Sequence, residues 1–312
     1  MRMTPLVFNA DDFGLSPSVN RSIAECARAG LMKSASLFVT HSAAEDALSA
    51  AAALAEPIGL GLHFCLTSGR AVSPPGAIPL LVGPDGRFRH GFLSLARLLA
   101  SRRRDEAACQ IRLEFDAQLA RFGELLPPAL KGAVDHIDSH QHIHVFPPIT
   151  SLLADAARRG GLTLRVPSEP VVSAGRLFRP PFLFHAKGYA KKRILDHFLA
   201  KSRRSENFGL SPVYFGIVDS GRMNVSAVRA ILGALSAGGI AAGNRPIEIN
   251  LHPWKTAGEE NLVPEEASAA DRAFARSHRR EEEYNLLTKH APQIRAEMSD
   301  LGICASRFNE PG

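Results

Sequence analysis

Residues 134–146 read VDHIDSHQHIHVF and place four histidines and two aspartates between aliphatic residues. This alternation is typical of a β-strand, in which side chains two positions apart share a face. On a regular strand, His140, His142 and His144 would therefore point the same way. Imidazole is the commonest protein ligand for metals, so the stretch predicts a divalent metal site. The alternative is a polar run on the surface that ends a strand. We disfavour it because the flanking aliphatic residues indicate a buried strand, and burying histidines that have no partner is costly.

Other predicted strands also end in polar, reactive residues. These residues and their strands are Asp11 and Asp12 (5–11), His63 (58–66), Arg165 (162–166) and His252 (247–251). Strands that alternate with helices indicate a parallel sheet, and about seven such units favour an α/β fold of the (β/α)-barrel type, irregular or seven-stranded. In a β/α barrel, residues at the carboxyl ends of the strands form the catalytic face. The sequence thus predicts one barrel domain over residues 1–312.

Two segments lie outside the predicted barrel repeat. Residues 170–212 form an insertion-like segment that is basic and aromatic, and residues 265–312 form a helical tail. The tail is predicted to hold one long charged helix over 265–297 and a short strand over 305–308.

Composition excludes several classes of protein. The 312 residues are 45% hydrophobic with no apolar run of membrane-spanning length, which predicts a globular domain without a transmembrane helix. The first residues read as a strand and not as a signal peptide, and the four cysteines are widely spread, so we expect a cytoplasmic protein. The net charge of +6 permits an anionic partner, but no nucleic-acid recognition motif is present. A serine-hydrolase elbow (Gly-x-Ser-x-Gly) is also absent.

The candidate residues together suit hydrolysis assisted by a metal. One carboxylate and two imidazoles leave coordination positions open for water and substrate. A second carboxylate could then accept a proton, and an imidazolium could protonate a leaving amine. Adjacent Asp11 and Asp12 reach one site only if the chain turns there, which Gly14 favours. Arg165 could orient the base carboxylate or form a purely structural ion pair.

Four motifs, taken in order, resemble those of YdjC/ChbG-type carbohydrate deacetylases. They are NADDFG (9–14), GLHF (61–64), DSHQHIH (138–144) and LHP (251–253), and the resemblance runs from residue 5 to about 255. The resemblance implies a barrel like that of polysaccharide deacetylases. It also implies an enzyme that removes N-acetyl groups from amino sugars and uses one divalent metal ion. Carboxylate and imidazole ligands suit Zn or Mg, and are compatible with Mn or Ni.

The resemblance also implies a role for individual residues. Asp12, His63 and His140 would hold the metal, Asp11 would be the general base and His252 the general acid. His142 and His144 would then contact the metal ligands or the substrate without binding the metal. The alternative is that they make structural hydrogen bonds.

The 170–212 segment is similar to that of the hopanoid-biosynthesis branch of this family. Basic residues interleaved with aromatics over 176–204 suit peripheral contact with an anionic membrane, here the inner membrane surface. The resemblance implies an N-acetylglucosaminyl hopanoid (a bacteriohopanetetrol glycolipid) as substrate. The alternatives are a lid helix packed on the barrel, a deacetylase of soluble chito-oligosaccharides, a metal-dependent phosphoesterase or amidohydrolase, and a non-catalytic glycolipid-binding protein. The oligomeric state is not predicted.

Overall fold

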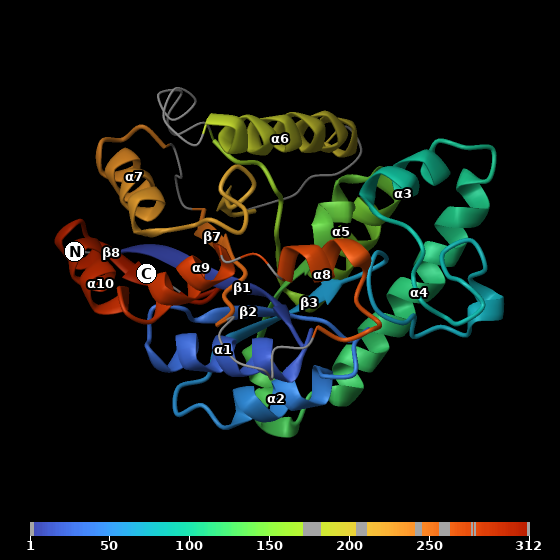
Figure 1. Ribbon diagram of the computed structural model, residues 1–312, viewed down its shortest axis with the longest axis horizontal. Helices are drawn as coiled ribbons and strands as arrows, with labels where there is room; N and C mark the ends of the chain where they lie inside the picture. The colour runs from blue at the N-terminus through green and yellow to red at the C-terminus, as the bar shows by residue number, and fades with distance from the viewer. Residues whose placement is uncertain are drawn as a thin grey trace.

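The computed structural model contains one sheet of eight strands, and every strand pair in it is parallel (Figure 1). It describes residues 3–170, 182–203, 211–240, 245–255, 263–275, 277 and 279–310. The strands are β1 (Thr4–Phe13), β2 (Ser34–Leu37), β3 (Gly59–Phe64), β4 (Val134–Ser139), β5 (Thr163–Leu164), β6 (Val213–Phe215), β7 (Ile247–Leu251) and β8 (Ile303–Ala305). Their order is β5-β4-β3-β2-β1-β7-β6, and β8 pairs with β1.

Helices follow most of the strands. They are α1 (Pro17–Arg28), α2 (Ala44–Ala52), α3 (Phe92–Leu99), α4 (Arg104–Leu125), α5 (Pro147–Gly160), α6 (Phe182–Ser202), α7 (Val225–Ser236), α8 (Ala269–Ala275), α9 (Arg279–Leu287) and α10 (Ala291–Asp300), with short 3-10 turns η1 (Pro75–Ala77), η2 (Pro128–Ala133) and η3 (His140–Val145). In Figure 1, α1 and α2 lie on one side of the sheet and α6 crosses the opposite side, above α5.

The parallel α/β architecture agrees with the prediction, but the barrel is only partly closed. β5 and β6 are the two ends of the strand order, and within the described residues they do not pair. The central strands β1, β3 and β7 are buried along most or all of their length, as expected for strands covered on both faces. The protein is therefore a half-barrel whose strand ends still converge on one edge.

The tail departs from the expected single helix. It forms three helices, α8, α9 and α10, and ends in β8 beside β1. The predicted strand over 305–308 is thus shifted toward the amino terminus. Parts of the predicted 170–212 segment, residues 171–181 and 204–210, lie outside the described residues, and the described remainder consists mostly of α6. Among the described helices, none has the length and apolar character needed to cross a membrane.

Candidate metal and acid–base site

The chain turns at the end of β1, as the sequence argument required. The register of β1 against β2 is interrupted between Ala10 and Phe13, and Asp12 adopts a φ of 68°. A left-handed conformation is uncommon for a residue with a side chain and is tolerated best by Asp and Asn. Because of this break, Asp11 and Asp12 line the same cavity and do not point to opposite faces.

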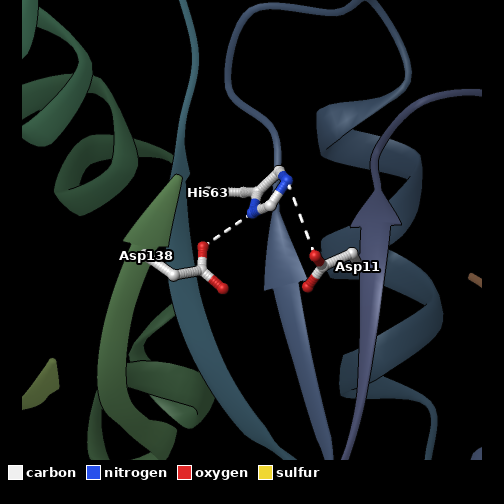
Figure 2. A group of neighbouring side chains, drawn as sticks. All are labelled: Asp11, His63 and Asp138. Carbon is white, nitrogen blue, oxygen red and sulfur yellow. Dashed lines mark hydrogen bonds and ion pairs between the residues drawn. The ribbon is translucent and has the colours of Figure 1, made fainter. Parts of the chain in front are cut away.

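His63 and Asp138 form a carboxylate–imidazole pair on adjacent strands. The two residues are register partners in β3 and β4, and His63 Nδ1 donates to Asp138 Oδ1 at 2.6 Å. Figure 2 shows that the other ring nitrogen faces Asp11, and Nε2 lies 4.0 Å from Asp11 Oδ2. A carboxylate that accepts a hydrogen bond from one imidazole nitrogen fixes the orientation of the ring. The other nitrogen can then bind a metal ion, as in many metal sites.

Arg165 binds both carboxylates from the side of β5. Its guanidinium is fully buried, donates to both oxygens of Asp11 at 2.9 and 3.0 Å, and lies 2.6 Å from Asp138 Oδ2. Burial alone would raise the pKa of Asp11, but Arg165, His63 and His252 outweigh it and hold that pKa well below its usual range. The same guanidinium lies 2.6 Å from Glu248. The predicted contact of Arg165 with Asp11 is therefore present within a larger buried ion cluster.

The histidine-rich stretch is not one strand, and the prediction of a shared face is wrong. β4 ends at Ser139, and His140–Val145 form η3, in which Gln141 and His142 have φ values of 53° and 57°. His140 and His142 line the cavity, whereas the Nδ1 of His144 is 2.5 Å from Ser139 Oγ. Successive left-handed residues rotate the chain out of the strand path, so the pattern of alternation stops applying there.

His252 follows β7 and, like His63, lies near Asp11 Oδ2. Its Nε2 is 3.9 Å from Asp11 Oδ2, and its backbone N–H donates to Glu283 Oε2 at 2.6 Å. Burial lowers the pKa of His252 to about 4, although Asp12 and Asp11 act in the opposite direction. The imidazole is therefore neutral near pH 7 when the cavity holds no ligand.

Three residues of the tail complete the site, and the sequence argument did not assign them. Arg280 lies 3.2 Å from Asp12 Oδ2, and Asp271 lies 3.2 Å from His140 Nε2. Glu283 accepts the backbone N–H of His252. In the sequence, these residues look like part of an ordinary charged face of a helix. Their neighbours in the sequence do not show that these charged side chains are buried and not exposed to solvent.

The candidate residues surround one cavity of about 180 Å³. Its lining consists of Asp11, Asp12, His63, His140, Gln141, His142, Lys191, Ser220, His252, Ala270, Asp271 and Phe274. Arg165 lies behind this wall, where it contacts Asp11. Residues separated by up to 263 positions, from Asp11 to Phe274, thus meet near the carboxyl ends of β1, β3, β4 and β7.

The donor atoms fit a divalent cation. Asp11, His63 and Asp138 are buried, their ligand atoms all lie within 4.8 Å of one another, and this group could bind a metal ion. Carboxylate oxygens and imidazole nitrogens are suitable ligands for zinc, magnesium, manganese and nickel.

In this parallel α/β half-barrel, carboxylates and imidazoles gather at the carboxyl ends of the strands. Proteins of the β/α-barrel class carry their active sites at that end. Residues 5–296 match the model of the YdjC-like protein family, and the chain belongs to that family. The family expectation from the four motifs is thereby confirmed.

The chain is similar to carbohydrate and chitooligosaccharide deacetylases. That of Mus musculus is 34% identical over 307 residues, which cover 96% of this chain and 92% of the relative. The chitooligosaccharide deacetylase of Proteus mirabilis is 38% identical over 163 residues, which cover 52% of this chain and 58% of the relative. A crystal structure of an Enterococcus faecalis V583 protein, proposed to cleave cellobiose phosphate, shares the fold with a TM-score of 0.62 at 21% identity and covers 98% of both chains.

Proposed function

We propose that the protein is a metal-dependent deacetylase that hydrolyses the N-acetyl group of an N-acetylglucosamine-bearing substrate. The observation that carries the proposal is a single cavity lined by Asp11, Asp12, His63, His140 and His252. The carbohydrate deacetylases of Mus musculus and Proteus mirabilis support the reaction and the substrate class.

We assign the metal ligands to Asp12, His63 and His140. Asp138 is less suited than Asp12, because both of its oxygens are engaged, Oδ1 by His63 Nδ1 and Oδ2 by Ser36 and Arg165. His140 would bind in place of its contact with Asp271. His63 would bind through Nε2, the nitrogen that Asp138 leaves available. A divalent ion held there would supply a Lewis acid that polarises the amide carbonyl. The ions that suit these ligands are Zn and Mg first, then Mn and Ni.

Asp11 and His252 would handle the protons. Arg165 and Asn250 hold the Asp11 carboxylate in place, since Asn250 Nδ2 donates to Asp11 Oδ2 at 2.9 Å. Asp11 would accept a proton from the attacking water, and the leaving nitrogen needs one proton. His252 is neutral at rest, so the proton that it donates must first reach it, and Asp11 Oδ2 at 3.9 Å is the adjacent source.

Acetate release from N,N′-diacetylchitobiose tests the reaction. We expect release by the metal-loaded protein, loss on chelation, and recovery when Zn²⁺ or Mg²⁺ is returned. Asp11→Asn, which keeps the shape of the side chain, should reduce kcat by about 100-fold or more. Phosphate release from a phosphorylated sugar without acetate release would instead favour a phosphoesterase.

We infer further that the substrate is an amino sugar on a lipid, an N-acetylglucosaminyl hopanoid, and that α6 contacts an anionic membrane. The described part of α6 exposes Lys187, Arg193 and Lys201, together with Ile194, which is 45% exposed. A cationic face with an apolar residue suits an anionic lipid surface. Of the predicted stretch over 176–204, Phe178 lies outside the described residues.

Liposome flotation separates docking from an ordinary helix surface. The test compares wild type with a variant in which Lys187, Arg193 and Lys201 are changed to Gln, on vesicles with and without anionic lipid. We expect only wild type to float, and only with anionic vesicles. Equal and negligible binding by both proteins would end the docking hypothesis and leave the soluble oligosaccharide as substrate.

A further inference from the structure

Lys191 reaches the candidate site from outside the sheet. It belongs to α6, in the segment that resembled an insertion, yet it lines the same cavity as Asp11, His142 and His252. On the sequence alone, Lys191 was grouped with the cations expected to face a membrane. Its neighbours on α6 do not share its position, since Lys187 and Arg193 are exposed.

The position of Lys191 is set by packing on both sides of it along the helix. A Cβ atom on Gly188 would lie 2.3 Å from the backbone oxygen of Val218, so α6 approaches the loop after β6 very closely. Leu195 and Leu199 are buried, and Ser202 Oγ donates to the backbone oxygen of Val145 at 2.8 Å. The helix therefore presents the side chain at a fixed place on the wall of the cavity.

The ammonium of Lys191 is the cavity charge that lacks a direct partner among the described residues. Asp11 is paired with Arg165, Asp12 with Arg280, and Asp271 with His140. Lys191 makes no hydrogen bond or ion pair with a described residue. Burial lowers its pKa, and the more distant Glu169 and Asp11 act against that shift. The side chain of Lys191 is partly buried. A partly buried cation without a direct partner loses part of its hydration, and an oxygen of a bound ligand would offset that loss.

The surroundings of Lys191 indicate which part of a ligand it would meet. Lys191 interacts electrostatically with Asp11 and His252, the two residues proposed to transfer protons, and this places it near the acid–base side of the cavity. It also interacts with His142 on η3. The ligand atoms assigned to the metal, on His63 and His140, belong to β3 and η3. An acyl oxygen polarised by the metal would lie toward those ligands, which leaves the sugar ring for Lys191.

We propose that Lys191 is a substrate-binding residue whose ammonium donates a hydrogen bond to a hydroxyl or ring oxygen of the amino sugar. The inference rests on the proposed deacetylase function for the placement of the sugar in this cavity. A contact made equally in the bound substrate and in the transition state changes affinity and leaves the chemical step unchanged. Lys191 would therefore determine KM and not kcat.

The first test is steady-state kinetics on N,N′-diacetylchitobiose. Lys191→Met keeps the length of the apolar chain and removes the donor, and Lys187→Met is the matched control, one turn earlier on the exposed face. We expect KM to rise about 10- to 100-fold for Lys191→Met, with kcat within about threefold. Lys187→Met should match wild type, and Lys191→Arg should recover part of the affinity.

The second test measures binding without turnover. Calorimetry compares the dissociation constant of the disaccharide for Asp11→Asn with that for the Asp11→Asn, Lys191→Met double variant. We expect weaker binding by the same 10- to 100-fold. Because an unpaired cation is removed, the unfolding midpoint should stay level or rise, whereas a structural lysine would lower it.

Several outcomes would overturn the inference. Equal affinity of the two Asp11→Asn proteins would do so, as would no detectable binding of the sugar to either, or an equal loss in Lys187→Met. If wild type binds the sugar but releases no acetate, the deacetylase proposal fails while the calorimetric comparison still decides the role of Lys191. If Lys191→Met does not fold, Lys191→Gln serves in both tests.

Discussion

Arg280 connects several parts of the site through one fully buried guanidinium. It lies 3.2 Å from Asp12 Oδ2, donates to the backbone oxygen of His252 at 2.8 Å, and stacks 5.3 to 5.5 Å from the rings of Phe274 and Trp254. The backbone of Asp12 is in the left-handed region, with a φ of 68°. For a residue other than glycine, this conformation costs on the order of 1 kcal/mol or more of folding free energy. The opposing charge of Arg280 helps to hold the Asp12 carboxylate in the cavity.

Removing Arg280 should therefore be costly. We expect Arg280→Met to lower the free energy of unfolding by about 3–5 kcal/mol, because Asp12 would remain buried without its cationic partner. Arg280→Lys, which keeps the charge, should lose less. Urea unfolding measures both changes, with Arg103→Met as control, since the Arg103–Glu106 pair lies exposed at the start of α4. A control that loses as much stability as Arg280→Met would contradict the expectation.

At the residue scale, the sequence indicated several of the residues that line the cavity, and Arg165 behind Asp11, but not the residues of the tail that hold them. Asp11, Asp12, His63, His140 and His252 stand in short motifs at predicted strand ends. Their partners from the tail have no local signal, because contacts between residues 31 to 268 positions apart depend on the whole fold. The strand pattern failed at η3 because a left-handed pair of residues breaks the alternation without glycine or proline to mark it.

At the scale of elements, α6 is positioned by one close backbone approach. Gly188 leaves no room for a methyl group beside Val218, and the helix also packs through Phe198, whose ring lies 4.9 Å from that of Phe146. This segment is basic and aromatic in sequence. That composition is compatible with a lid over the cavity and with a membrane contact, and it does not decide between them. The inward position of Lys191 depends on helix rotation, which the composition of a segment does not determine.

A methyl group at residue 188 should displace α6. We expect Gly188→Ala to lower the free energy of unfolding by about 1–3 kcal/mol, because rigid backbone atoms must move. Binding of the disaccharide should weaken as well, since Lys191 would move with the helix. Gly123→Ala on α4 is the control: nothing lies within 4 Å of its added methyl group, and helix propensity predicts a gain of about 0.5–1 kcal/mol. Thermal unfolding and calorimetry check both variants, and a Gly188→Ala protein as stable as wild type would refute the packing argument.

At the scale of the molecule, side chains bridge the gap that the sheet leaves between β5 and β6. Glu169, after β5, accepts the backbone N–H groups of Ile217 and Val218, after β6, at 2.7 and 3.0 Å. Arg165 reaches from the same side to Glu248 on β7. The sequence predicted about seven strands in parallel from hydrophobic runs and helical spacers, and the described sheet has eight parallel strands. The sequence did not predict incomplete closure, because strand lengths at the two edges carry no clear signal.

The Glu169 bridge predicts a pH-dependent contribution to stability. Burial raises the pKa of Glu169 from 4.5 to about 7, although the three backbone N–H groups favour the ionised form. The folded protein therefore keeps this proton more tightly than the unfolded chain. The stabilisation is complete below pH 4.5 and is lost as the pH rises through about 7, a difference of about 3 kcal/mol.

Comparison of wild type with Glu169→Gln isolates this contribution. Relative to the variant, the unfolding free energy of wild type should fall between pH 5 and pH 8, because the variant has no carboxyl group to ionise. Glu124→Gln, at an exposed position on α4, should follow wild type at every pH. Denaturant unfolding at several pH values measures the difference, and a gap that is constant with pH would rule out the bridge as its source.

The tail gives the site an order of assembly during synthesis. Every motif residue, from Asp11 to His252, leaves the ribosome before Asp271, Arg280 and Glu283, which hold their side chains or backbone. At typical elongation rates of about 5–20 residues per second, the nascent chain spends seconds with its acidic and imidazole groups present but unsupported. A polypeptide that stopped between His252 and Asp271 would therefore carry each signature motif of the family and lack the three residues that hold the site.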